Sequence, residues 1–113
     1  MDAYDLIISV SAFNKKYEDH FNPLDLSTAI CSKYHHSTLS LTRIKPHHLH
    51  GDSQIIDEAL ANLLMSRVYI LELPQSRFRW NFPDSPAEYF NKNIKPALSE
   101  VELTNLEELA KSL

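Results

Sequence analysis

Residues 52–82 read DSQIIDEALANLLMSRVYILELPQSRFRWNF and combine three successive patterns that set the fold class. Apolar residues recur at three- and four-residue spacings over residues 52–66, which predicts a one-sided helix that begins at Asp52. Residues 68–73 form a β-branched and aromatic run that is too short for a helix, and Pro74 ends it. Aromatic and polar side chains alternate over residues 77–82, which predicts a second strand and a hairpin.

The N-terminal segment 4–21 has two interpretations. Its apolar residues fit helical spacing from Leu6 to Tyr17, and every second residue from Tyr4 to Val10 is apolar, as in a strand. We favour the helix because it accounts for more positions. Asn22-Pro23 then predicts the start of a second helix that runs to about Tyr34, since asparagine caps helices and proline is tolerated at their first position.

The other segments carry local signals of their own. Two leucines alternate with hydroxylic residues over 38–44, which predicts a strand. Ser85-Pro86-Ala87-Glu88 has the pattern of a helix start, and Pro96 limits or kinks that helix. Thr104 and Glu107 repeat the capping pattern and predict a short final helix.

Together these segments predict an α+β fold, with residues 1–113 as a single domain. Strands 38–44, 68–73 and 77–82 are expected to form a small, mainly antiparallel sheet of about three strands, whose order the sequence leaves open, packed with about four to five helices. The core is expected to draw on apolar residues of all these segments: Leu39, Leu41, Ile56, Leu60, Leu63, Leu64, Ile70, Phe78, Trp80, Phe90 and Leu109.

Charge and cysteine content limit the partners and the cellular compartment that fit this chain. Eleven basic and fifteen acidic side chains give a formal charge of −4, which disfavours non-specific binding of polyanions and favours a basic partner. Cys31 is the only cysteine, so an intrachain disulfide is impossible and a reducing compartment fits best. The acidic N-terminus and the short apolar runs predict neither a signal peptide nor a membrane span. We therefore expect a cytoplasmic protein with no membrane partner.

The densest group of ionisable residues lies at His47, His48, His50 and Asp52. Imidazole and carboxylate ligands suit zinc, iron or nickel. The spacing matches no complete metal motif, and a further ligand would have to come from distant His20, His35 or His36. We therefore interpret these side chains as loop imidazoles and a helix cap, and keep a small metal-dependent enzyme as an alternative.

Other catalytic patterns are incomplete. Cys31 with His35 or His36 resembles a nucleophile beside its base, but a lone cysteine on an apolar helix stripe is usually a small buried hydrophobe. With one glycine, the chain has neither a serine nucleophile elbow nor a glycine-rich phosphate loop. We expect no enzyme activity, no catalytic residues and no cofactor.

Arg77, Arg79 and Trp80 form the one concentration of basic and aromatic residues in the sequence. Such a strand face suits a protein interface, or a nucleic acid bound through phosphates and stacked bases. Its ordinary interpretation is a core-facing aromatic row backed by solvated or ion-paired arginines. The negative net charge makes nucleic acid the weaker of the two ligands.

Acidic residues near the start of the chain, among them Glu18 and Asp19, would complement a basic protein if the fold gathers them. The sequence thus favours a protein-binding function, as a small bacterial or phage inhibitor of the immunity-protein type that neutralises a toxin or masks a nucleic-acid-acting enzyme. The expected partner-binding residues are Arg77, Arg79, Trp80, Asp19 and Glu18. The alternative in another class is a nucleic-acid accessory module that uses Arg77, Arg79 and Trp80. The sequence does not predict the oligomeric state.

Overall fold

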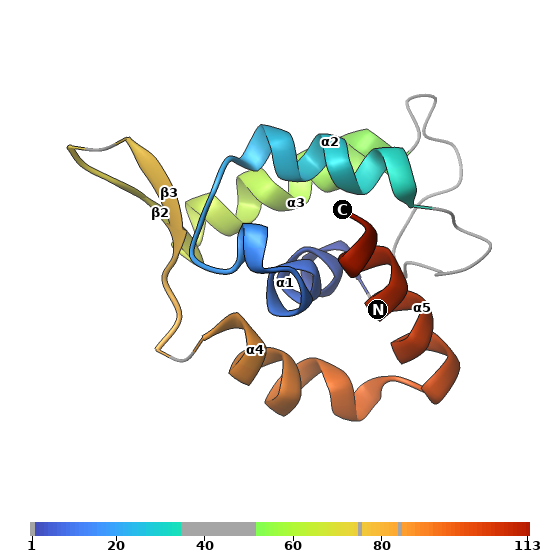
Figure 1. The fold of residues 1–113 in the computed structure, drawn as a ribbon. Helices are drawn as coiled ribbons and strands as arrows, with labels where there is room; N and C mark the ends of the chain where they lie inside the picture. Colours follow the sequence, from blue (N-terminus) through green and yellow to red (C-terminus); the bar gives the residue numbers. More distant parts are fainter. Residues whose placement is uncertain (1, 35–51, 75, 84) are drawn as a thin grey trace.

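The computed structural model describes residues 2–34, 52–74, 76–83 and 85–113; the side chains of residues 52–55 are not part of that description. Its central element is helix α1 (Ala3–Phe13), which lies among α3, α4 and α5 (Figure 1). Leu6, Ile7 and Val10 are completely buried. The helical interpretation of the N-terminal segment is confirmed for residues 3–13, whereas residues 20–21 of the same segment form a strand.

Burial on several sides explains why α1 forms despite mediocre helix formers. Ser9 and Ser11 are both fully buried, and their hydroxyls donate to the backbone carbonyls of Asp5 and Ile7 one turn earlier. These bonds satisfy side chains that would otherwise be costly to bury. Tertiary packing here outweighs intrinsic helix propensity.

A short 3₁₀ turn, η1 (Lys15–Tyr17), follows α1 and leads into strand β1 (His20–Phe21). Helix α2 (Pro23–Lys33) then begins as the sequence predicts, because the side-chain oxygen of Asn22 accepts hydrogen bonds from the first free backbone N–H groups. Leu26 and Ile30 bury the inner face of α2, which packs along α3 (Figure 1).

Helix α3 (Asp52–Met65) confirms the amphipathic pattern. Ile56, Leu60 and Leu63 are buried, whereas Leu64 is 39% exposed. The prediction that Leu64 belongs to the core was therefore wrong, because one residue further along a helix turns the side chain about 100° away from the buried face.

Two backbone hydrogen bonds close the end of α3. Val68 N–H donates to the carbonyl of Leu63, and Arg67 N–H donates to the carbonyl of Leu64. This is the Schellman pattern, in which the residue after the helix takes a left-handed conformation. Arg67 has a φ of 61°, a region in which glycine is favoured.

The described sheet has the order β1-β3-β2, with β2 (Tyr69–Glu72) and β3 (Arg77–Trp80) forming the antiparallel hairpin that the sequence predicts. Both strands are shorter than expected. β1 pairs antiparallel with β3 and was not predicted. The predicted strand 38–44, with Leu39 and Leu41, lies outside the described residues.

The C-terminal part of the chain consists of α4 (Pro86–Tyr89), a π turn η2 (Phe90–Ile94), a 3₁₀ turn η3 (Lys95–Ala97) and α5 (Glu100–Ser112). The predicted cap at Ser85 is confirmed, since its hydroxyl accepts from Glu88 N–H. Pro96 lies where the irregular turns interrupt the helix, as expected of a residue without a backbone N–H.

The predicted start of the last helix at Thr104 was wrong. The capping box forms at Ser99 and Glu102, where each side chain accepts from the other residue's backbone N–H. Thr104 lies inside α5 and its hydroxyl donates to the carbonyl of Glu100. The earlier start lengthens the helix.

One contiguous core joins α1 to the other elements. Of the predicted core residues, Trp80 and Phe90 are buried with the residues of α3 given above, and Phe78 and Leu109 are partly buried against them. Ile70 is only half-buried. Over the described ranges, every helix is too short or too polar to cross a membrane.

Candidate functional site

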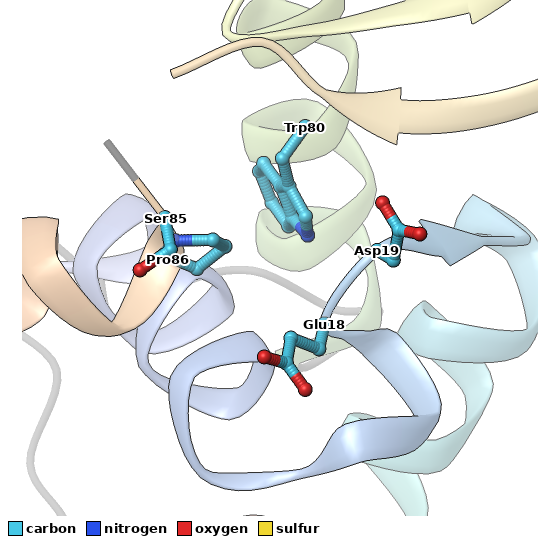
Figure 2. Close-up of a pocket in the computed structure, with 5 residues that line it drawn as sticks. All are labelled: Glu18, Asp19, Trp80, Ser85 and Pro86. Carbon is cyan, nitrogen blue, oxygen red and sulfur yellow. The ribbon is translucent and has the colours of Figure 1, made fainter. Parts of the chain in front are cut away.

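An open pocket of about 440 Å³ lies between the segment that joins η1 to β1 and the connection from β3 to α4. Glu18 and Asp19 line it on one side, Ser85 and Pro86 on the other, and Trp80 lies between them (Figure 2). We call it the acidic pocket. It brings together three of the five residues that the sequence predicts to bind a partner, namely Glu18, Asp19 and Trp80.

Trp80 fixes the geometry of the acidic pocket. Its indole N–H donates a 3.0 Å hydrogen bond to the carbonyl of Tyr17, directly before Glu18. The ring also stacks on Phe21 at 4.7 Å and on Phe82 at 5.6 Å between centroids. With 6% of its surface exposed, Trp80 is a rigid wall of the pocket rather than a projecting anchor.

The two carboxylates are more accessible. Glu18 and Asp19 are exposed residues, and Asp19 keeps 85% of its side chain in solvent. Asp19 lies 3.5 Å from Nδ1 of His20, while Glu18 forms no ion pair with any residue in the described ranges. Adjacent carboxylates beside an apolar wall create a negative potential that favours a cationic group.

The residue before the carboxylates is buried and neutral. Burial raises the pKa of the Tyr17 hydroxyl above its ordinary value of 10.0, and the charge of Asp25 raises it further. Tyr17 therefore stays protonated at neutral pH and anchors the segment through packing. The negative charge that faces the pocket comes from Glu18 and Asp19.

The arginines lie on the opposite face of the sheet from Trp80, because side chains alternate along β3. Arg79 Nε donates a 2.5 Å hydrogen bond to Glu72 on β2. Glu72 lies two residues after Ile70, the residue of β2 directly opposite Arg79. This bond lowers the pKa of the Glu72 carboxyl below its ordinary value of 4.5, and His20 contributes in the same direction. Arg77 is exposed beside this group.

His20 completes the charged face. Its Nε2 atom lies 3.5 Å from Glu72 and is buried, but it has no well-formed hydrogen bond among the described residues. A separation of 3.5 Å is too long for a strong hydrogen bond, so we interpret the contact as electrostatic. Arg77 and Arg79 thus belong to a face that holds His20 and Glu72, and not to the acidic pocket.

Most residues of the metal and cysteine alternatives lie outside the described part of the chain. His47, His48 and His50 lie outside the described residues, as does the side chain of Asp52, although Asp52 begins α3. Elsewhere in the described chain no group of three histidine, cysteine, aspartate or glutamate residues could hold a metal ion. Cys31 is half-buried on α2, and its proposed bases His35 and His36 are also undescribed.

Sequence reasoning missed one wall of the acidic pocket. Ser85 and Pro86 were recognised as a helix start, but nothing local indicated that this start faces Glu18. Phe82 stacks on both Trp80 and Tyr89, and these contacts hold the start of α4 next to the end of β3. They explain why Ser85 and Pro86 lie across the pocket from Glu18. No family model, curated protein or solved structure matches the chain.

Proposed function

We propose that this protein works by binding another protein, and that the acidic pocket receives a lysine or arginine side chain of that partner. The observation that carries the proposal is the placement of the Glu18 and Asp19 carboxylates beside the wall formed by Trp80 and Pro86. This placement offers two carboxylates to the head of a basic side chain, while the little surface that Trp80 and Pro86 leave exposed suffices only for the adjoining aliphatic stem.

The energetic logic is that of a charged interface. Exposed ion pairs contribute little by themselves, but a cation that sits between carboxylates and is partly removed from water is held more strongly. The net charge of −4 adds long-range attraction toward a basic surface and speeds association. Both effects favour a basic protein over a nucleic acid as the partner.

A small acidic chain with these properties suits an inhibitor of the immunity-protein type, which would mask the basic surface of a toxin or a nucleic-acid-acting enzyme. The single cysteine supports a cytoplasmic setting for this role. The nucleic-acid alternative has less support. Trp80 is buried, so it has little surface for stacking a base, and Arg79 is already paired with Glu72.

The test begins with capture of a partner by the tagged, full-length protein from cells of its own source and identification by mass spectrometry. The decisive measurement is the affinity of the captured protein for the Glu18→Gln/Asp19→Asn variant. We expect a loss of about ten- to a hundred-fold, which corresponds to one or two charge-assisted contacts, and a slower association rate.

A matched control is Glu100→Gln/Glu108→Gln, which removes the same charge from exposed positions on α5. It should reduce the association rate slightly and leave the dissociation rate unchanged. The proposal fails if no protein is captured, or if both double variants weaken the complex equally. Salt-sensitive binding of DNA or RNA that is lost in Arg79→Ala would instead favour the nucleic-acid alternative.

A further inference from the structure

Strand β2 lies at one edge of the sheet, because the order of the strands is β1-β3-β2. The β2–β3 hairpin projects away from the helices at one end of the molecule (Figure 1). No strand in the described part of the chain pairs with the outer edge of β2. Such an edge presents a row of backbone donors and acceptors to another strand.

The hydrogen-bond pattern identifies which residues face outward. The carbonyl of Val68 accepts a 2.9 Å hydrogen bond from Asn81 N–H on the β3 side. Bonded positions recur at every second residue of an antiparallel pair, so Ile70 also directs its backbone groups toward β3. Tyr69 and Leu71 consequently direct their N–H and C=O groups to the open side.

The same edge carries exposed apolar side chains. Leu71 is 47% exposed and Leu73, directly after the strand, is 71% exposed. Natural edge strands usually carry charges or bulges that discourage pairing. Leu71 and Leu73 give this edge no such protection, so it is open to pairing with another strand.

We propose that β2 pairs antiparallel with β2 of a second copy of this chain, about a twofold axis at Leu71. In this register Leu71 lies opposite Leu71 of the second copy, and Tyr69 lies opposite Leu73 of the second copy. The outward N–H and C=O groups then meet as hydrogen-bonded pairs. The exposed leucines of the two copies pack against each other on one face of the joined sheets.

The charges of β2 are compatible with this pairing. Glu72 lies opposite Ile70 of the second copy, so the two Glu72 carboxylates do not face each other, and each is already paired with its own Arg79. An isologous contact of this kind is self-complementary and closes as a dimer. The paired edge shares no residue with the acidic pocket, so the dimer does not depend on the proposed function.

The strand is short, which sets the expected strength. Stable dimers bury roughly 800 Å² or more per partner, and one four-residue strand with a following leucine buries less. The dimer should therefore form only as the concentration is raised. Sedimentation velocity over a concentration series measures this equilibrium directly.

Amide hydrogen exchange on the same samples locates the interface. We expect exchange at the Leu71 amide to slow as the concentration rises. The Ile70 amide, which faces β3, serves as the internal control and should not change. A protein that remains monomeric at its solubility limit overturns the proposal, and so does a dimer that leaves exchange at Leu71 unaltered.

Two substitutions complete the test. Leu73→Lys should abolish so weak a dimer, because each copy would lose the leucine that lies beside Tyr69 of the other copy and would place a charge there. Leu24→Lys is the matched control, since Leu24 is 72% exposed on α2 and lies outside the hairpin. It should dimerise like the original protein. If both variants dimerise, or neither does, the β2 edge is not the interface.

Discussion

The side-chain amide of Asn14 donates a 2.9 Å hydrogen bond to the backbone carbonyl of Ala110, 96 residues further along the chain. The same nitrogen lies 3.3 Å from the carbonyl of Leu113, and the side-chain oxygen accepts from Lys16 N–H. Asn14 therefore joins the end of α1 to the end of α5 and caps the turn that leads to the acidic pocket. One side chain satisfies several backbone groups at helix ends.

Asn14→Ala should destabilise the fold by about 1–3 kcal/mol, because the partly buried Ala110 carbonyl loses its side-chain donor. Urea unfolding followed by fluorescence measures the change. Asn93→Ala is a suitable control, since the exposed Asn93 amide donates to the carbonyl of Tyr89, only four residues earlier in the chain. Equal losses in the two variants would mean that the link between α1 and α5 adds nothing to stability.

Ser99→Ala should cost about 1 kcal/mol, the typical loss for a removed N-cap. Thr104→Ala should change stability by only a few tenths of a kcal/mol, because Thr104 lies inside α5 and alanine is the better helix former. Unfolding free energies of the two variants compare the two possible starts of the helix. A larger loss at Thr104 would contradict the observed capping box.

These two capping patterns show where sequence reasoning reaches its limit. Ser85 and Asn22 were identified because each precedes a proline at a helix start and has no local competitor. Ser99 and Thr104 both precede a glutamate by three residues, so the local sequence pattern does not favour one as the helix cap over the other. Tertiary packing of the added turn, in which Leu103 is partly buried against the core, favours the start at Ser99.

The unpredicted features arise from contacts between distant residues. β1 is two residues long and has no pattern of its own; Phe21 is held there by stacking on Trp80. The acidic pocket exists because the Trp80 indole bonds to Tyr17, and neither residue type nor spacing signals that bond. Sequence reasoning identified Glu18, Asp19 and Trp80 one at a time and placed Arg79 with them, whereas the alternation of β3 places Arg79 on the other face.

Arg67→Gly should stabilise the fold by about 0.5–1 kcal/mol. Arg67 has a φ of 61° after α3, and a left-handed backbone is unfavourable for a residue with a Cβ atom. Arg67→Ala distinguishes an effect of the backbone conformation from an effect of the charge. Alanine removes the guanidinium and keeps the Cβ atom, so this variant should not be stabilised. Urea midpoints at equal slope measure both effects. A stabilised alanine variant would assign the gain to the lost charge instead.

Stability should fall as the pH is lowered past the ordinary carboxyl value of 4.5, in part through Glu72. The pKa of Glu72 is lower in the folded protein than in the unfolded chain, so its contribution is complete above the unfolded pKa and is lost as the pH falls through the folded one. Glu102, whose pKa is lowered by the backbone N–H of Ser99, acts in the same direction.

Glu72→Gln should therefore reduce the acid dependence of the unfolding free energy without abolishing it. Arg79→Met removes the main cause of the lowered pKa and should flatten the curve similarly. Urea unfolding at a series of pH values gives both curves. An Arg79→Met protein with an unchanged acid slope would show that the guanidinium does not hold the Glu72 carboxylate.

Trp80→Phe should loosen the wall of the acidic pocket that carries the carboxylates. Phenylalanine keeps an aromatic ring next to Phe21 and Phe82 but removes the indole N–H that donates to Tyr17, so a buried carbonyl loses its donor and the fold loses about 1–3 kcal/mol. Amide exchange at Glu18 and Asp19 should become faster.

Tyr69→Phe is the matched control, because it removes a buried 2.8 Å hydrogen bond to the Leu60 carbonyl away from the pocket. It should lower stability by a similar amount and leave exchange at Glu18 and Asp19 no faster than this loss of global stability requires. If the two variants speed exchange at these residues equally, the indole bond does not position the carboxylates.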